Sequence, residues 1–225
     1  MTAPDLCIAF DLDDTLYKER AFVVSGRRAV AREASVRSGV DADELFSLME
    51  RSENAFGSLL ERLSSTPASD MTIDRVLEIY RYHKPQLTLP AESVMLLDTL
   101  RDKGIATAII TDGRSETQWN KIRALGLDTY VSDDRIIVSE DIGADKHTPV
   151  PFELLTARVG AARYMYVGDN PVKDFHYPNL MGWQTVMLVD TEGVNIHNQN
   201  LEAVGPDFRP KIEINNLKDI VCLLH

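Results

Sequence analysis

Four short hydrophobic runs stand out along the chain, and each ends at a polar residue that is able to take part in chemistry. Residues 6–10 lead to Asp11, residues 105–110 to Thr111 and Asp112, residues 164–167 to Gly168 and Asp169, and residues 184–189 to Asp190. Short apolar runs bounded by turn residues are typical of buried strands in a parallel sheet. The pattern therefore predicts four strands whose carboxyl ends carry polar side chains.

Hydrophobic residues recur at helical spacing between these runs. The spacing predicts helices over residues 91–103, 116–125 and 149–160, and the first two are followed by Gly104 and Gly126, which are typical helix-terminating residues. Alternating strands and helices predict an α/β fold with a doubly wound, Rossmann-like parallel sheet. Ligands of such sheets bind at the carboxyl ends of the strands, where the polar residues would lie.

Residues 18–87 do not follow this alternation. Helical patterns over residues 21–38, 42–64 and 73–82 occupy the segment without a strand between them. We therefore predict an α/β core formed by residues 1–17 and 88–225, with residues 18–87 as a helical insertion after the first strand. A further helix over residues 217–224 would close the chain.

The charge of the chain limits its partners. The sequence has 225 residues and a formal net charge of -11, which argues against nucleic acid or an anionic membrane as a partner, because both are held by clustered Lys and Arg. An anionic small substrate remains possible, since a bound metal can reverse the local charge. Cys7 and Cys222 both lie in apolar stretches and are expected to be buried, reduced thiols. Without a signal-peptide pattern or a run long enough to span a membrane, a cytoplasmic location is expected.

The first candidate for chemistry is the acidic turn after the first run. It contains Asp11, Asp13, Asp14 and Thr15 within five residues. Neighbouring acids are costly to bury unless a cation or a proton relieves their repulsion, and Mg²⁺ prefers oxygen ligands of this kind. Taken alone, such a turn is more often a helix cap or a solvated loop.

Three further groups follow at the same predicted edge of the sheet. They are Thr111-Asp112-Gly113, Lys146, and the segment from Gly168 and Asp169 to Asp174. A hydroxyl and a glycine suit close approach of a phosphate to the backbone, and a lysine suits its charge. Singly, each group fits an ordinary turn or a solvated surface charge. Their common order and placement favour a single site.

These residues, in this order, resemble the four-motif signature of the haloacid dehalogenase superfamily. The matching positions are Asp11-x-Asp13-x-Thr15, Thr111, Lys146, and Gly168-Asp169 with Asp174. The resemblance extends over the whole chain, because a helical cap inserted after the first strand is a common arrangement in that family. It identifies residues 18–87 as the cap.

The resemblance also implies a role for each residue. Asp11 would attack phosphorus and become an aspartyl-phosphate, while Asp13 would protonate the leaving alkoxide and then activate water. Mg²⁺ would be held by Asp11, the backbone carbonyl of Asp13, and Asp169. Thr111 and Lys146 would hold the transferring oxygens. Asp174 would orient Lys146 or a metal-bound water.

Two of these positions separate branches of the family. Asp13 favours phosphoryl transfer, because dehalogenating relatives lack this second acid, and Thr15 stands where the mutase branch typically has Gly. The resemblance thus implies a Mg²⁺-dependent phosphomonoester hydrolase that acts on a small phosphorylated metabolite. The alternatives are a phosphomutase and a non-catalytic binding or regulatory module. The oligomeric state would be a monomer or a small homo-oligomer.

Further residues are candidates for substrate contact. Asp112, Gly113 and Arg114 adjoin Thr111 and are candidates for binding substrate, and Asp112 stands where many relatives have Asn. His147 replaces the first Pro of the usual Lys-Pro-x-Pro stretch and is either a loop residue or a phosphate contact. In the cap, three polar residues are weaker candidates, and two tryptophans of the core are expected to be buried rather than to bind ligand. The cap residues are Arg51, Asn54 and Arg81, and the tryptophans are Trp119 and Trp183.

Overall fold

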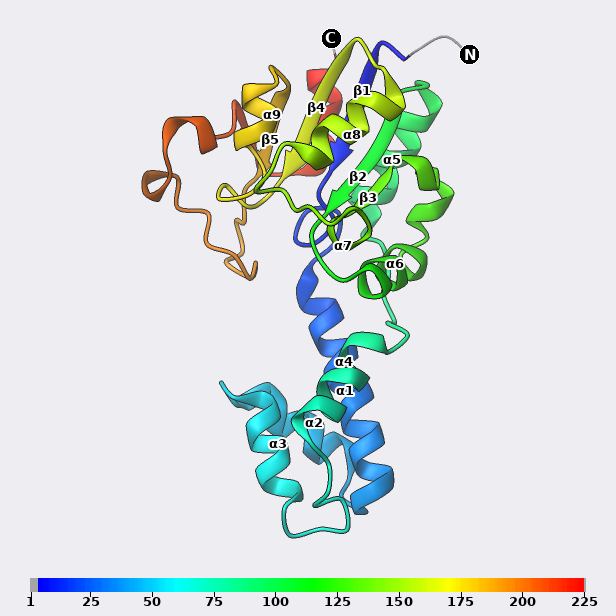
Figure 1. Ribbon diagram of the computed structural model, residues 1–225, viewed down its shortest axis with the longest axis vertical. Helices are drawn as coiled ribbons and strands as arrows, with labels where there is room; N and C mark the ends of the chain where they lie inside the picture. Colours follow the sequence, from blue (N-terminus) through cyan, green and yellow to red (C-terminus); the bar gives the residue numbers. More distant parts are fainter. Residues whose placement is uncertain (1–3, 225) are drawn as a thin grey trace. The chain divides into compact units, whose positions relative to one another are not determined.

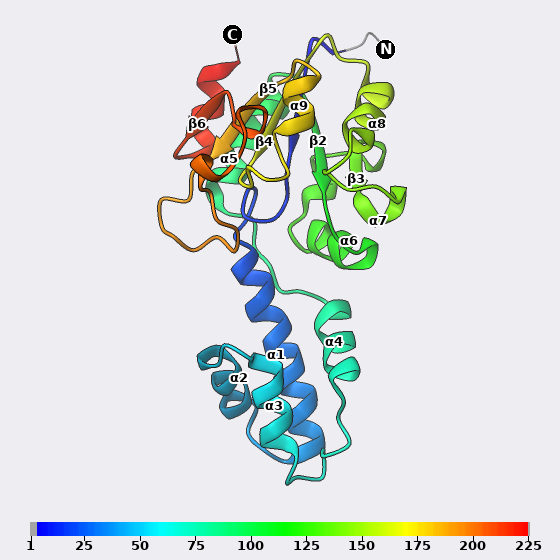
Figure 2. The same cartoon turned by 60° about the vertical axis from the view of Figure 1, so that its left-hand side comes forward.

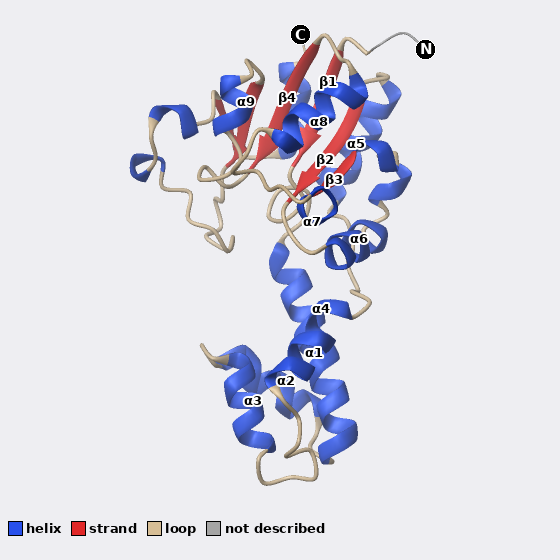
Figure 3. Cartoon of the chain, in the orientation of Figure 1, coloured by secondary structure: helices blue, strands red, loops and turns tan. Residues whose placement is uncertain are grey.

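The computed structural model describes residues 4–224, and its central feature is a six-stranded, entirely parallel sheet (Figure 3). The strand order is β3-β2-β1-β4-β5-β6, so β1 lies in the middle and the chain continues to one side of it and then to the other. The strands are β1 (Leu6–Phe10), β2 (Ala106–Thr111), β3 (Ile136–Val138), β4 (Arg163–Gly168), β5 (Gln184–Leu188) and β6 (Ile212–Ile214). The predicted α/β class and parallel Rossmann-like sheet are confirmed. The carboxyl ends of β1, β2 and β4 are neighbours at the point where the strand order reverses, which is where ligands bind in such sheets.

Helices cover the sheet (Figures 1 and 2). Alternate side chains of the central strands, among them Cys7, Ala9 and Tyr166, pack with Phe152 and Leu155 of one helix in a common hydrophobic core. This is the period of two expected of a strand against the apolar stripe of a helix. The helices of this part are α5 (Ala91–Asp102), α6 (Ser115–Ala124), α7 (Ser139–Ile142), α8 (Val150–Val159) and α9 (His176–Leu180). Short 3₁₀ helices are η1 (Leu127–Thr129), η2 (Asp133–Arg135), η3 (Leu201–Ala203), η4 (Pro206–Phe208) and η5 (Leu217–Leu223).

The chain divides into two compact units, one made of Met1–Arg20 and Thr88–His225 and the other of Ala21–Leu87. The second unit is helical, with α1 (Glu19–Ser38), α2 (Ala42–Arg51), α3 (Ala55–Leu63) and α4 (Ile73–Tyr82). It has a hydrophobic core of its own, which includes Val30, Leu45 and Leu59. A helical segment after β1 is confirmed. The predicted domain boundaries, at residues 17/18 and 87/88, stay a prediction.

The predicted single helix over residues 42–64 is wrong, because the segment forms α2 and α3. The break comes at Asn54, whose side chain accepts a hydrogen bond from the Gly57 amide (3.1 Å) and caps α3. An Asn side chain can accept a hydrogen bond from a backbone amide that would otherwise bond to a carbonyl of the preceding turn. A continuous helix is therefore interrupted at such a residue, and a new helix begins after it. The exposed Asn54 therefore has a structural role.

The structure confirms some of the remaining sequence expectations and corrects others. Cys7 is buried as expected, but Cys222 is exposed, because η5 is a 3₁₀ helix with only part of its surface against the core. Trp183 lies in the hydrophobic core, whereas Trp119 is half-buried and donates its indole N–H to Asp141 (2.9 Å). The three-residue strands β3 and β6 were not predicted, since runs so short carry no periodicity. Across residues 4–224, no helix combines the length and the apolar character needed to cross a membrane.

Candidate active site

Acidic, hydroxyl and lysine side chains gather at the carboxyl edge of the sheet. Asp11 follows β1, Thr111 ends β2 and Asp169 follows β4, while Lys146 comes from the loop between α7 and α8. The Asp11 amide donates to the Val167 carbonyl (2.8 Å), which continues the pairing of β1 with β4 beyond the strand. The pocket at this edge is lined by Asp11, Asp13, Glu19, Thr111, Asp112, Lys146, Asn170, Lys173 and His197.

Lys146 joins two of the acids. Its Nζ donates to Asp11 Oδ1 (2.8 Å) and to Asp174 Oδ1 (2.6 Å), and its side chain is only 3% exposed. Burial disfavours the ammonium, but the carboxylates of Asp11 and Asp174 outweigh burial and hold the Lys146 pKa well above its usual range. The Lys146 backbone amide donates to Asp112 Oδ1 (3.1 Å), which fixes the start of the side chain. Lys146 is thus a permanent, oriented cation in this pocket.

Asp174 is held in place by the turn after β4. Its Oδ2 accepts the backbone amides of Asp169 (3.1 Å) and Asn170 (2.8 Å), while its Oδ1 accepts Lys146. A side chain at Gly168 would overlap with the Asp174 carboxylate, so only glycine leaves room for it there. Both Asp174 oxygens are therefore committed to donors of the protein.

The part of the site around Asp11, called here the Asp11 half, contains more buried acidic side chains than cationic ones. Oxygens of Asp11, Asp169 and Asp174 lie within 4.8 Å of one another, and all three residues are buried. Burial, reinforced by the neighbouring carboxylates, raises the pKa of Asp169 to about 9, and burial, opposed by Lys146, raises the pKa of Asp11 to about 7. A hard divalent cation would relieve this repulsion, and carboxylate oxygens are the ligands it prefers. The residues present fit such a metal ion.

The part of the site around Asp13, called here the Asp13 half, is instead rich in hydrogen-bond donors. Its carboxylate accepts hydrogen bonds from Lys121 Nζ to both oxygens (2.8 Å each), from the Tyr17 hydroxyl (2.5 Å) and from Gln118 Nε2 (3.0 Å). Burial alone would raise its pKa, but Lys121, Tyr17 and Gln118 together outweigh burial and lower the pKa of Asp13 below its ordinary value. The side chain of Asp13 is not among the clustered metal-ligating groups.

Comparison with known proteins places this arrangement in a family. A model of the haloacid dehalogenase-like hydrolase family matches residues 8–188. The chain belongs to this family.

Relatives extend the match to nearly the full length of the chain. A glyceraldehyde 3-phosphate phosphatase of Methanopyrus kandleri is 26% identical over 227 residues, covering 95% of this chain and 94% of the relative. A glyceraldehyde 3-phosphate phosphatase of Methanocaldococcus jannaschii is 30% identical over 199 residues, covering 81% of this chain and 84% of the relative. The protein is therefore a phosphatase, a phosphoric monoester hydrolase, of the haloacid dehalogenase-like family, as predicted.

A solved structure shares the fold. The crystal structure of the HAD-hydrolase YfnB from Bacillus subtilis bound to magnesium has a TM-score of 0.64 and 20% identity, and the match covers 99% of both chains. At this identity the similarity concerns the fold alone.

The structure brings most of the predicted site residues of this phosphatase together, but not all of them. Asp112 lines the pocket, whereas the neighbouring Gly113 and Arg114 are exposed and are not part of the lining. The Gly113 amide donates to Ser139 Oγ (2.9 Å), and Arg114 precedes α6 as its N-terminal capping position. His147 is exposed, and its amide donates to Asp145 Oδ1 (3.1 Å) within the turn that carries Lys146.

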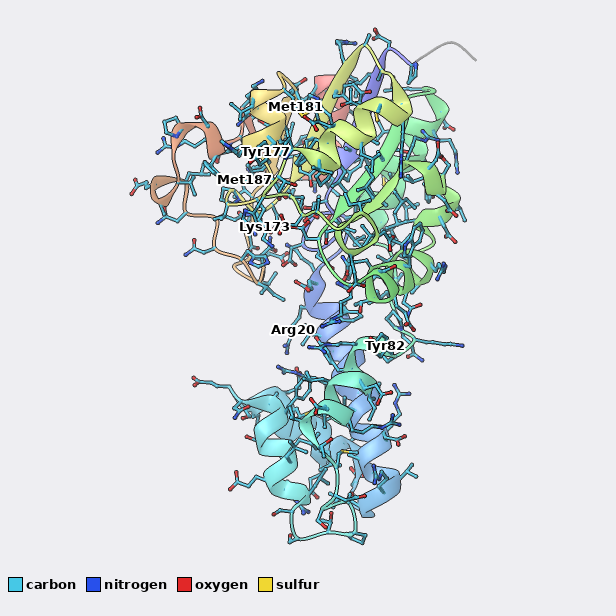
Figure 4. The ribbon with its side chains drawn as sticks, in the orientation of Figure 1. Arg20, Tyr82, Lys173, Tyr177, Met181 and Met187 are labelled. Atoms are coloured by element: carbon cyan, nitrogen blue, oxygen red, sulfur yellow. The ribbon has the colours of Figure 1, made fainter. Side chains whose placement is uncertain are left out.

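The sequence analysis missed two kinds of residue in this phosphatase: residues of the pocket, among them Lys173 and His197, and two residues behind the pocket that contact Asp13, namely Gln118 and Lys121. Lys173, labelled in Figure 4, lies on the loop between β4 and α9 with its Nζ 3.6 Å from Asp112 Oδ2. Gln118 and Lys121 lie three residues apart on α6, and both are buried with Ile122. Their positions on the apolar face of a predicted helix, next to the Thr111 motif, are a signal that could have revealed them. His197 belongs to the loop after β5, where the sequence carries no comparable pattern.

Proposed function

We propose that this phosphatase is Mg²⁺-dependent and hydrolyses a small phosphorylated sugar, with a triose phosphate such as glyceraldehyde 3-phosphate as the first candidate. The observation that carries the proposal is Lys146, which ties the Asp11 carboxylate into the pocket wall beside Thr111. A carboxylate held beside a fixed cation and a hydroxyl is suited to attack a phosphoryl group whose oxygens those donors receive. The relatives named above supply the substrate class.

Asp11 would act as the nucleophile. One of its oxygens forms a bond to phosphorus while the ester bond to the sugar breaks, which leaves an aspartyl-phosphate. Lys146 Nζ and the Thr111 hydroxyl hold the transferring oxygens and stabilise the charge that they carry. Asp174 would keep Lys146 oriented, since it accepts the same ammonium at 2.6 Å.

Asp13 would move the protons. Because its lowered pKa makes the carboxylate the resting form, Asp13 would first take up a proton from solvent and donate it to the departing sugar oxygen. It would then take a proton from the water that attacks the aspartyl-phosphate. That second step releases inorganic phosphate and restores the free Asp11 carboxylate, so the two half-reactions balance.

Asp11 and Asp169, with the backbone carbonyl of Asp13, would hold Mg²⁺. When bound, the ion supplies Lewis-acid polarisation of the phosphoryl oxygens and offsets repulsion between the substrate and the acids. The excess of buried acids over Lys146 supports this assignment.

Phosphate release from a panel of esters tests the proposal. The panel contains glyceraldehyde 3-phosphate, other sugar phosphates, phosphoglycolate, phosphoserine and nucleoside monophosphates, each assayed with Mg²⁺ and with a chelator. We expect release that needs Mg²⁺, is fastest with a sugar phosphate, and falls at least about 1,000-fold in Asp11→Asn. Asp102→Asn, an exposed acid at the end of α5, is the matched control and should keep full activity.

Three outcomes separate the parts of the proposal. Full activity in Asp11→Asn would refute the nucleophile, and equal activity in chelator would refute the metal. A clear preference for a nucleotide would refute the substrate class alone. Acid quenching followed by mass spectrometry should find the phosphoryl group on the peptide that contains Asp11.

A further inference from the structure

The helix after β2 places a buried cation against the acid Asp13. Lys121 comes from α6, its side chain is 3% exposed, and its Nζ reaches both Asp13 carboxylate oxygens at 2.8 Å. Glu19, which also lines the pocket, lies 3.8 Å from the same ammonium. A lysine is rarely buried to this extent without a defined partner. Two equal contacts to one carboxylate fix its direction as well as its charge.

Gln118, one turn earlier on the same helix, joins Asp13 to the phosphate-binding hydroxyl. Its Nε2 donates to Asp13 Oδ2 (3.0 Å) and to Thr111 Oγ1 (2.6 Å). A threonine hydroxyl has a single proton, and here its oxygen already accepts from an amide. The Thr111 proton is therefore left to be donated elsewhere, and Thr111 lines the pocket.

The turn before α6 is shaped around this glutamine. Gly113 has a φ of +150°, and a Cβ at this position would lie 3.0 Å from the Gln118 side chain. A larger residue would thus be strained and would press on Gln118. The glycine that the sequence suggested for phosphate contact also makes room for the network.

We propose that Lys121 and Gln118 are positioning residues of this phosphatase. Lys121 aims the Asp13 carboxylate for proton transfer, and Gln118 aims the Thr111 hydroxyl at the transferring phosphoryl group while bracing Asp13. The proposal rests on the proposed function, because it takes Asp13 as the group that protonates the leaving oxygen. It adds a layer of α6 residues that touch neither the substrate nor a metal ion.

Leaving-group dependence separates positioning from a loss of structure. An alkoxide needs a proton as it departs, whereas 4-nitrophenolate departs without one, so only the alkyl ester depends on a well-aimed Asp13 in the first chemical step. We compare kcat/KM for the best alkyl phosphate of the panel and for 4-nitrophenyl phosphate. Lys121→Met should lose about 100-fold with the alkyl ester and less than about 5-fold with the aryl ester. Lys121→Arg, which keeps two donors and the charge, should recover most of the loss.

Gln118→Glu provides the second, milder variant. It keeps the shape of the side chain but replaces the donor to Thr111 and Asp13 by an acceptor. Because Thr111 binds the phosphoryl group of every ester, we expect kcat/KM to fall at least about 10-fold with both esters, and more with the alkyl ester. Arg123→Met, which removes an exposed cation from the same helix, is the control and should leave both values unchanged.

The outcomes distinguish this proposal from the proposed function. If wild type releases phosphate and Asp11→Asn does not, the proposed function stands, whatever the α6 variants do. Equal losses with both esters in Lys121→Met, or no recovery in Lys121→Arg, would overturn the positioning role of Lys121. Unchanged kcat/KM in Gln118→Glu would overturn the role of Gln118. If Lys121→Met does not fold, the ester dependence of Gln118→Glu and the activity of Lys121→Arg decide the matter in the same way.

Discussion

Asp11 and Asp13 are two residues apart in the chain, yet they lie in opposite electrostatic surroundings. Asp11 shares Lys146 with Asp174 and faces Asp169, and burial raises its pKa to about 7. Asp13 is surrounded by donors, chiefly Lys121, and its pKa is lowered despite burial. Carboxylates with divergent surroundings commonly divide the roles in acid–base chemistry. The difference shows that the partners, which come from distant parts of the chain, decide what each acid of the motif can do.

The largest effect is expected from removing Lys146, the cation of the Asp11 half. Lys146→Met leaves Asp11 and Asp174 buried without their shared partner, next to the buried Asp169, so we expect the metal-free protein to lose about 3–5 kcal/mol of unfolding free energy. Chemical denaturation in chelator measures the loss, with Lys103→Met, an exposed lysine, as the control. A loss below about 1 kcal/mol would show that the acids are neutral or otherwise paired.

A second effect is expected from adding Mg²⁺ to the Asp11 half. Mg²⁺ at 100 times its Kd should stabilise the wild type by about 2.7 kcal/mol, because it binds only the folded acids. Thermal unfolding with and without Mg²⁺ gives the shift in Tm. Asp169→Asn should abolish most of that shift, and an unchanged shift would place the metal elsewhere.

The third prediction concerns the pH dependence of stability, which should have opposite signs in the two halves. The folded-state pKa values of Asp11 and Asp169 lie above the ordinary 3.8, so their stabilising contribution is complete below about pH 4 and is lost as the pH rises through 7 to 9. In chelator, the unfolding free energy should fall by several kcal/mol between pH 5 and pH 9. Saturating Mg²⁺ should flatten this fall, and a rise with pH in chelator would contradict the repulsion among these acids.

The smallest effect is expected from removing one hydrogen-bond donor, the Tyr17 hydroxyl, from the Asp13 half. Tyr17→Phe takes away a single hydrogen bond while Lys121 and Gln118 remain, so the cost should be about 1 kcal/mol. Because the pKa of Asp13 is lowered in the folded state, the stability that these donors provide is present at neutral pH and is lost on acidification. The difference between wild type and Tyr17→Phe should therefore shrink below about pH 4. A difference that grows in acid would contradict this account.

The fold could be predicted from the sequence wherever a hydrophobic pattern was long enough. The run before Asp11 coincides with β1, and the helical spacing that ends at Gly104 predicted α5 to within one residue. The break between α2 and α3 was missed, because the cap formed by Asn54 is a local side-chain contact within a continuous helical pattern. Periodicity alone does not register such contacts.

The motif residues of the site could be predicted from the sequence, but the residues that form hydrogen bonds with them could be predicted less well. Asp11, Thr111, Lys146 and Asp169 follow strands or their adjoining loops, and parallel topology brings those ends together. The partners of Asp13 were not foreseen, since Lys121 is 108 positions away and only tertiary structure aligns α6 with the first loop.

Gly168 sets a limit on how this enzyme can vary. It touches no reacting group and its backbone needs no unusual conformation, yet any side chain there would occupy the space of the Asp174 carboxylate. In a saturation library selected for phosphatase activity, every substitution at position 168 should therefore be depleted as strongly as those at Asp174 itself. A compensating change at Asp174 would lose the acid that holds Lys146, so no pair of substitutions at these two positions leads to an active neighbour in sequence space. The two positions are therefore expected to evolve together, because the missing side chain of Gly168 leaves the space that the Asp174 carboxylate fills.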